Sequence, residues 1–422
     1  MLVPKMLFKF LGGAQEVGRS SIVLSDEGTL LLDYGIKLNH KIEYPVAVPN
    51  VDAFILSHAH LDHSGHAPAL YNEMLLPAFG TEPTLKFSEL LLNDSLNIAK
   101  REHMSQKFHK RQIASFMHRY TSMDYHSPFT IGNFDVEFFD AGHIAGSAIT
   151  RIERRKAKDN KRIVYTGDFK SEPQYLHKGA EVVEADVLIT ESTYATREHP
   201  DREALIKNFI EKIKETLDNK GTVLLPVFAV GRSQEILSIL YKHNLTQYTF
   251  IDGMARAATS IVLKYGNFIN NSDMLANAVE EATTIKDRDE RGIALNSPSI
   301  IMTTAGMLTG GPVLDYITRL RSNSQILLTG YQVEGSNGRM LLDSGNIMLD
   351  KKLTKIPAPA SYYDMSAHAG KKELYEYVEK SKAKKIICLH GDAENAIALA
   401  EGLKLEGYDA YAPKINETIR MD

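Results

Sequence analysis

Four histidines and an aspartate fall between residues 58 and 66, in the segment HAHLDHSGH that follows an apolar run. Imidazole nitrogens and carboxylate oxygens are the ligands that Zn²⁺ prefers, with an open position left for water. His58 and His60 are two residues apart, so on a strand their side chains point the same way and can bind one ion together. The turn that follows directs Asp62 and His63 elsewhere. The segment therefore predicts ligands for two adjacent metal ions.

Further ligands are expected at the ends of other strands, where an apolar run gives way to glycine. His143 in FFDAGHIAGSA, Asp168 in RIVYTGDF and His390 in IICLHGD share this setting. Carboxylates bridge metal ions readily, so Asp168 is expected to contact both ions. Asp33 follows the run TLLL, and we expect it to orient a ligand histidine by a hydrogen bond.

Length and composition limit the classes of protein to which the chain could belong. Its 422 residues suggest two domains, and 43% hydrophobic residues are enough for a sizeable core. The net charge is −4, so a nucleic-acid partner must be met by local basic patches or by a metal centre. The single cysteine, Cys388, cannot form an internal disulfide, and its apolar setting predicts a buried strand residue. No run approaches the ~20 apolar residues of a membrane helix, and the start does not resemble a signal peptide. We expect a cytoplasmic protein.

The first ~190 residues read as short strands with few helices. The expected strands cover residues 7–13, 20–25, 29–35, 53–60, 134–143, 148–153, 162–169 and 187–193, and residues 84–118 are expected to be helical. From about residue 200 the pattern changes to apolar run, glycine-containing turn and more polar stretch. It occurs at 222–244, 299–320 and 325–342 and indicates the strand–loop–helix units of a parallel α/β sheet.

The placement of histidine indicates how these two parts are connected. Residues 200–367 contain one histidine, His243, and then His368 and His390 appear in SAHAG and CLHGD. If both lie near the first cluster, the chain leaves one domain, forms a second and returns. We therefore expect a first domain made of residues 1–194 and 357–422, with residues 195–356 inserted between its two parts.

Several motifs resemble a known group of proteins. HAHLDH, DAGHIAGSA and TGD resemble the metallo-β-lactamase superfamily. GTVLLPVFAVGRSQEIL, MTTAGMLTGGP, LTGYQVEGSNGR and MSAHAG resemble its β-CASP subgroup, whose members process nucleic acids. Together with GGAQEVGRSS, they are most similar to archaeal relatives of the cleavage and polyadenylation specificity factor endonuclease, with RNase J next. The resemblance implies an αββα metallo-β-lactamase sandwich with an inserted parallel α/β domain.

The resemblance also implies a role for each site residue. One Zn²⁺ would be bound by His58, His60, His143 and Asp168, and a second by Asp62, His63, Asp168 and His390, giving two zinc ions per chain. Asp62, Glu191 and His368 are the catalytic residues that the family implies, with Glu191 and His368 acting together on the leaving group. Histidine at position 390 is the residue that RNA-processing members carry where DNA-specific members typically have valine. It favours RNA as the substrate.

Two zinc ions that share a water lower its pKa, and the hydroxide would attack the phosphodiester in line. Phosphates away from the metals are expected at the loops that join strands to helices, where helix N-termini favour anions. The residues expected to bind them are Arg232, Ser233, Gly310, Gly311, Ser336 and Arg339.

Other functions share part of this pattern. A small-molecule hydrolase would share HAHLDH but would leave residues 195–356 and SAHAG without a purpose. A DNA-processing nuclease is disfavoured by His390, and a catalytically idle scaffold of an RNA-processing complex is disfavoured by the complete set of ligands. The sequence leaves endonuclease and 5′-exonuclease activity both open. A homodimer is a reasonable expectation for the subgroup.

Overall fold

The computed structural model describes residues 6–38, 41–155, 161–296 and 298–421, and these form two compact units. The first unit comprises Met1–Pro173, His177–Glu198 and His368–Asp422, and the second comprises Gln174–Leu176 and His199–Ala367. The chain therefore returns to the first unit after completing the second.

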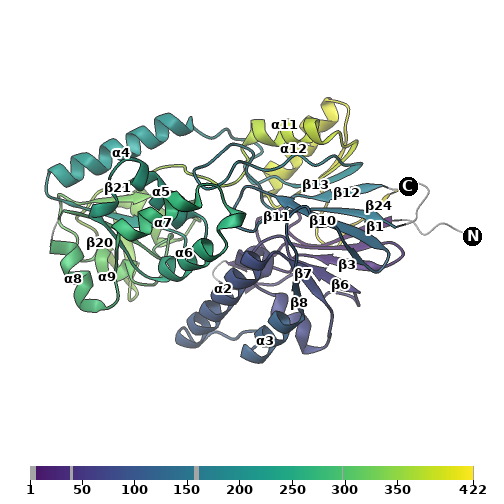
Figure 1. Cartoon of the computed structure of the whole chain (residues 1–422), viewed down its shortest axis with the longest axis horizontal. Coiled ribbons are helices and arrows are strands. Elements are labelled where there is room, and N and C mark those ends of the chain that lie inside the picture. The colour runs from purple at the N-terminus through teal and green to yellow at the C-terminus, as the bar shows by residue number, and fades with distance from the viewer. Residues whose placement is uncertain (1–5, 39–40, 156–160, 297, 422) are drawn as a thin grey trace, which may run out of the picture. The chain divides into compact units, whose positions relative to one another are not determined.

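The first unit is built on two seven-stranded sheets (Figure 1). One sheet has the order β24 (Thr418–Met421), β1 (Met6–Gly12), β2 (Ser21–Ser25), β3 (Thr29–Leu32), β6 (Ala53–Ile55), β7 (Ala78–Gly80) and β8 (Tyr120–Ser122). The other has the order β23 (Asp409–Tyr411), β22 (Lys385–Leu389), β13 (Val187–Glu191), β12 (Arg162–Tyr165), β11 (Ala148–Arg154), β10 (Phe134–Asp140) and β9 (Phe129–Ile131). A short pair, β4 (Lys37–Leu38) and β5 (Ile42–Glu43), lies outside both sheets.

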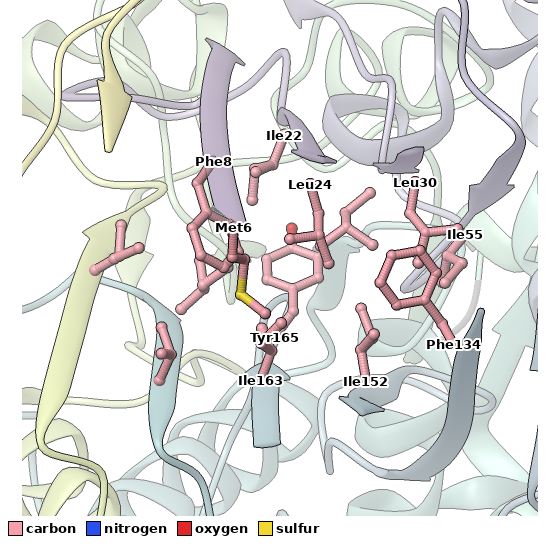
Figure 2. Close-up of a cluster of buried hydrophobic side chains, with 14 of the residues drawn as sticks. Met6, Phe8, Ile22, Leu24, Leu30, Ile55, Phe134, Ile152, Ile163 and Tyr165 are labelled. Atoms are coloured by element: carbon pink, nitrogen blue, oxygen red, sulfur yellow. The ribbon is translucent and has the colours of Figure 1, made fainter. Parts of the chain in front are cut away.

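The main hydrophobic core lies between the two sheets (Figure 2). Phe8 and Leu24 of the first sheet and Ile163 and Tyr165 of the second belong to this one buried cluster. Side chains alternate along each strand, so Leu30 and Leu32 face this core while Leu31 belongs to the cluster on the outer face of its sheet. The eight strands expected from sequence all appear in these two sheets.

Helices cover the outer face of each sheet and complete four layers (Figure 1). α2 (Glu82–Arg101), α3 (Lys110–Arg119) and the 3₁₀ helix η1 (Ala67–Asn72) pack on the first sheet. α11 (Lys371–Ser381) and α12 (Ala393–Leu405) pack on the second, with Cys388 fully buried beneath them. The expected helical stretch 84–118 is two helices, because His103 adopts a positive φ of 54° and buried Phe108 anchors the intervening loop.

The second unit contains a six-stranded sheet in which all strand pairs are parallel. Its order is β16 (Thr283–Thr284), β15 (Thr249–Ile251), β17 (Ser299–Thr303), β14 (Thr222–Pro226), β18 (Gln325–Leu328) and β21 (Ala360–Tyr362), and β19 (Asn346–Leu349) pairs with β20 (Lys352–Lys355) as a hairpin. The helices are α4 (Arg202–Asp218), α5 (Arg232–Lys242), η2 (Thr246–Tyr248), α6 (Met254–Lys264), η3 (Gly266–Phe268), α7 (Ser272–Glu281), α8 (Arg288–Asn296), α9 (Val313–Ile317) and α10 (Asn337–Ser344). This unit has the parallel α/β character expected from sequence.

The boundaries of the two units differ in three places from those expected from sequence. The long segment of the second unit begins at His199, whereas the start expected from sequence is residue 195. The expected return to the first domain is at residue 357, but β21 pairs with β18 in the sheet of the second unit, so the return comes at His368. Residues 174–176 also group with the second unit, because the N–H groups of Tyr175 and Leu176 donate to the carboxylate of Glu235. Among the described residues, no helix is both long and apolar enough to cross a membrane.

Candidate metal centre

The histidine-rich segment follows directly after the carboxyl end of β6, which lies between β3 and β7 in the first sheet. β6 ends at Ile55, and His58 and His60 lie in the irregular segment beyond it, not on the strand itself as expected from their spacing. Asp62 and His63 lie on the single turn α1 (Leu61–Ser64). His58 and His60 belong to one potential ligand group and Asp62 and His63 to another, so one stretch of chain supplies two groups of ligands.

Close backbone contacts hold this segment in place. The N–H of Ser20 donates to Asp62 O at 2.8 Å, and the N–H of Tyr34 donates to His63 O at 2.8 Å. Gly35 lies so close to the turn that a Cβ atom there would come within 1.7 Å of Asp62 O. Only glycine allows this approach, which explains the glycine that follows Asp33 and Tyr34 in the sequence.

Four side chains form a first potential ligand group: His58, His60, His143 and Asp168. Nδ1 of His60 lies 3.2 Å from Nε2 of His58 and 3.1 Å from Nε2 of His143. Oδ2 of Asp168 lies 3.5 Å from Nε2 of His58. Four ligands on a tetrahedral zinc with bonds of ~2.0–2.1 Å are separated by roughly 3.3 Å, so these spacings suit one such ion.

Asp62, His63, Asp168 and His390 form a second group. Nε2 of His63 lies 3.2 Å from Nε2 of His390 and 3.3 Å from Oδ1 of Asp168. Oδ2 of Asp62 lies 3.4 Å from Nε2 of His390. His390 follows β22 with a positive φ of 47°, and its N–H donates to Gly13 O at 2.7 Å. A left-handed conformation at a non-glycine residue is characteristic of functional sites.

Asp168 belongs to both groups, and the side chains that face its carboxylate are the candidate ligand histidines, among them His63 and His390. Its side chain is 1% exposed, and neither carboxylate oxygen accepts a hydrogen bond from any residue that the structure describes. Leaving a buried carboxylate unpaired costs on the order of several kcal/mol. Two cations, one at each oxygen, would remove this cost. The residues present therefore fit a pair of divalent metal ions that share Asp168.

A buried hydrogen-bond network lies behind the ligands. Oδ2 of Asp33 is 2.7 Å from Nδ1 of His63, which leaves Nε2 of that ring directed at the second ligand group. The same carboxylate accepts from Ser57 Oγ at 2.7 Å and from Tyr165 Oη at 2.6 Å. Sequence analysis identified Asp33 but missed Ser57 and Tyr165, because a serine and a strand tyrosine carry no distinctive pattern of their own.

Burial and local charge set the protonation of the ligands. Burial lowers the pKa of His58 and of His60, which keeps both rings in the neutral form that binds metal. Burial by itself would raise the pKa of Asp168, but the facing His390 and His63 outweigh it and hold that pKa well below its usual range. Burial likewise opposes ionisation of Asp62, but its hydrogen bond with His390 keeps its pKa low. Both carboxylates are therefore ionised at neutral pH.

His368 and Glu191 lie together beside the shared aspartate. Nδ1 of His368 is 3.0 Å from Oε2 of Glu191 and 3.9 Å from Oδ2 of Asp168. The other Glu191 oxygen accepts the N–H of Phe169 at 2.8 Å. Asp168, Glu191 and His368 could also hold an ion as a third group. Because the Glu191 carboxylate is already used by two donors, proton transfer suits this pair better than metal binding.

Glu373 joins the loop that carries His368 to the loop that carries Asp168. Its carboxylate accepts from the N–H of Gly370 at 2.9 Å, of Ser171 at 3.0 Å and of Glu172 at 2.8 Å, and from Lys170 Nζ at 2.5 Å. Both Glu373 and Lys170 are buried. Sequence analysis missed this residue, although its position three residues after Gly370 at the start of α11 is a recognisable capping pattern.

The residues expected to bind RNA phosphate all lie in the second unit. Ser233 is fully buried, its hydroxyl donates to Ala229 O, and its N–H donates to Phe228 O, so it does not offer the free donors expected at a helix start. Ser336 caps α10, and Arg339 pairs with Asp343. Gly310 and Gly311 lie in the loop before α9.

Arg232 is the exception in this set. It is 8% exposed, and its Nη1 has no hydrogen-bond partner among the described residues. Burial, followed by the nearby Arg202, lowers its pKa to about 10, so the guanidinium stays charged at neutral pH. Arg232 is therefore the member of the predicted set with an unused donor.

Comparisons with known protein families agree with this architecture. Residues 233–341 match the Beta-Casp domain, and residues 355–413 match the Zn-dependent metallo-hydrolase RNA specificity domain. Residues 14–217 match the family described as anti-Pycsar protein Apyc1. The three matches together cover the segments that carry the two ligand groups and the strands of the parallel sheet other than β14, which lies between two of the matched ranges.

Individual relatives extend over nearly the whole chain. "Probable RNase MJ4" of Methanocaldococcus jannaschii is 39% identical over 98% of this chain and 99% of its own length. "RNase aCSPSF2" of Saccharolobus solfataricus is 33% identical over 98% of this chain and 85% of its own length. A crystal structure of a protein of unknown function from Enterococcus faecalis V583 is 16% identical with a TM-score of 0.64, covers 99% of this chain and 100% of its own, and shares the fold.

Proposed function

Since this chain belongs to the β-CASP family of metallo-β-lactamase-fold metallo-hydrolases, we propose that it is a zinc-dependent ribonuclease that hydrolyses RNA phosphodiester bonds at a two-metal centre. The observation that carries the proposal is the pair of ligand groups that share Asp168. Support for RNA comes from the description of the matched specificity domain and from the names of the two relatives.

The donor set supports zinc and a stoichiometry of two. Each group offers three side chains of its own in addition to the shared carboxylate, and neutral imidazoles with carboxylates suit Zn²⁺. Two such ions, when bound, would acidify a water molecule and offset negative charge on the phosphate. The remaining chemistry falls to the protein's own side chains.

The departing oxygen of the RNA needs a proton, and His368 is placed to supply it. Burial by itself lowers the pKa of His368, but the facing Glu191 and Asp168 carboxylates outweigh it and raise the pKa to about 9. The imidazole is therefore protonated at neutral pH, as a general acid must be. Because Nδ1 faces Glu191, Nε2 is the nitrogen that would donate to the leaving oxygen. Asp62 contributes as a ligand and as a negative charge beside His390.

For the second unit, we keep the expectation that it contacts RNA, with Arg232 as its main phosphate contact. The support is its charged, buried guanidinium with an unused donor. Gly310, Gly311 and Arg339 stay secondary candidates, and a homodimer stays a prediction.

The proposed function is tested with a 5′-labelled RNA and a DNA of the same sequence. Zinc-loaded protein should cleave the RNA and leave the DNA intact, and the product sizes will separate internal cleavage from stepwise removal of 5′ nucleotides. Asp168→Asn should abolish cleavage, because both ligand groups lose their shared charge. Asp135→Asn, which changes an exposed carboxylate in the same unit, should cleave like the unmodified protein. Preferential cleavage of DNA would contradict the proposal.

A further inference from the structure

An unusually basic surface lies on the first unit, between the end of α2 and the first turn of α3. Residues 100–111 contain five exposed lysines and arginines against one carboxylate, Glu102, in a chain whose net charge is −4. The five cationic residues, which we call the basic segment, are Lys100, Arg101, Lys107, Lys110 and Arg111. Neither the metal centre nor the proton-transfer pair makes use of them.

The charges of the basic segment are not balanced within the protein. Arg101 pairs with Glu102 at 3.2 Å, but Lys110 and Arg111 have no carboxylate partner among the described residues. Some other exposed cations of the same unit do have such partners, including Arg155 with Asp135 and Lys382 with Glu184.

Two of the cations also occupy a position that disfavours them. Lys110 and Arg111 are the first two residues of α3, and the first turn of this helix contains no acidic residue. The helix dipole favours negative charge at this end, so a cation in the first turn opposes helix formation. Helix stability therefore does not explain why the chain places positive charge there.

The basic segment is connected to the histidine-rich loop through neighbouring side chains and one hydrogen bond. Nζ of Lys107 lies 5.8 Å from the centre of the Tyr44 ring, and that ring lies 4.4 Å from the ring of His66, the last residue of HAHLDHSGH. Asn72 Nδ2 donates to Lys107 O at 3.2 Å, which fixes the segment to η1, the element that continues the metal-binding loop. The cations are thus held at a defined position relative to the ligands.

We propose that the basic segment binds the sugar-phosphate backbone of the RNA outside the cleaved bond, as a sequence-independent contact on the metallo-hydrolase unit. The inference rests on the proposed function. It adds a binding position for the part of the RNA that lies outside the cleaved bond. Exposed cations without carboxylate partners favour a polyanion, and proteins that bind single strands without sequence preference use such charged surfaces. The interaction is electrostatic, so it must weaken with salt in proportion to the number of contacts.

The test compares two double substitutions that remove the same charge. Lys110→Gln with Arg111→Gln changes the basic segment, and Lys404→Gln with Arg420→Gln changes two exposed cations elsewhere on the unit. The affinity of zinc-loaded protein for a 30-nucleotide RNA is measured between 50 and 200 mM KCl, and complexes are separated before cleavage proceeds. The salt slope is the steepness with which the logarithm of RNA affinity falls against the logarithm of salt concentration. Two lost contacts should lower it by about 1.4. The unmodified protein should bind RNA more tightly than the double variant at 50 mM KCl, and this advantage should shrink about sevenfold by 200 mM. The control pair should keep the original slope.

The outcomes separate the inference from the function on which it rests. If the unmodified protein cleaves RNA and both double variants keep its slope, the basic segment does not contact RNA and the inference is overturned. If both double variants lose slope equally, the effect is one of overall charge and the inference is again overturned. If the unmodified protein neither binds nor cleaves RNA, the proposed function itself fails. Thermal unfolding of each variant checks that the loss does not come from misfolding.

Discussion

Nδ1 of His368 lies 3.0 Å from Oε2 of Glu191, although 177 residues separate the two in sequence. Oε1 of the same carboxylate accepts the N–H of Phe169, the residue after Asp168. Glu191 therefore fixes the position of the His368 imidazole relative to Asp168. It also supplies the negative charge that, after the opposing effect of burial, is the largest cause of the raised pKa of His368.

This relationship predicts the pH dependence of cleavage. A general acid works only while protonated, so kcat should fall as pH rises through the pKa of His368, which the neighbouring carboxylates raise to about 9. Glu191→Gln keeps the shape of the side chain but removes its charge, so the pKa of His368 should fall and the alkaline limb should move to lower pH. A pH–kcat profile of both proteins measures the shift. An unmoved alkaline limb would mean that another group titrates there.

His390 and His368 should respond differently to substitution. His390→Ala removes a member of the second ligand group, so the protein should lose bound zinc and activity together. His368→Ala should keep most of its zinc and still bind RNA, yet cleave ~10²–10⁴-fold more slowly, as is typical for loss of a general acid. Elemental analysis and single-turnover kinetics give the two readouts.

A substrate that needs no proton sharpens this comparison. A nitrophenyl phosphodiester releases a stable phenolate, so it should partly restore the rate of His368→Ala and should not restore His390→Ala. Loss of zinc from His368→Ala would instead assign His368 to the third potential ligand group, with Asp168 and Glu191.

The fold could be predicted from sequence because its signals are local and mutually consistent. Consecutive apolar residues such as Leu30, Leu31 and Leu32 indicate a strand that is buried on both faces, and the structure places them so. The resemblance to the β-CASP group supplied the order of the layers, and the family comparisons confirm it. The return at His368 could not be predicted, because it depends on the pairing of β21 with β18, a contact between distant segments.

The candidate metal ligands named from sequence lie together in the structure, and several of them, including His143, Asp168 and His390, lie beyond a strand end with a glycine nearby. Glu373 had no such signal, because its importance comes from three backbone N–H groups that the fold brings to it. Ser233 lacks the free donors expected at this helix start. The glycine turn before it does begin a helix, but its hydroxyl and N–H are already used by Ala229 and Phe228.

Metal removal should destabilise the first unit. Neither oxygen of the buried Asp168 accepts a hydrogen bond from the described residues, and without cations only the facing histidines offset its charge. Bound metal should therefore add to the free energy of unfolding. Treatment with a chelator should lower the Tm by several degrees, since about 1 kcal/mol shifts Tm by ~2–4 °C in units of this size. Added Zn²⁺ should restore the original Tm. Asp168→Ala removes the orphaned charge, so its Tm should respond much less to chelation, and an equal response would contradict the assignment.

Glu373 should act on the rate through the position of His368. Glu373→Ala removes the acceptor of three N–H groups and of Lys170, and breaking such a buried pair costs roughly 3–5 kcal/mol of stability. We expect kcat to fall because the loops that carry His368 and Asp168 are no longer fastened together. KM should change little, because the Glu373 carboxylate is buried and already used by groups of the protein. Glu373→Gln keeps one acceptor oxygen and should recover part of both losses.

Glu376→Gln, on the exposed face of the same helix, should change stability by less than about 1 kcal/mol and leave kcat unaltered. A Glu373→Ala protein that is destabilised yet retains full kcat below its unfolding temperature would show that the residue supports the fold without positioning the general acid.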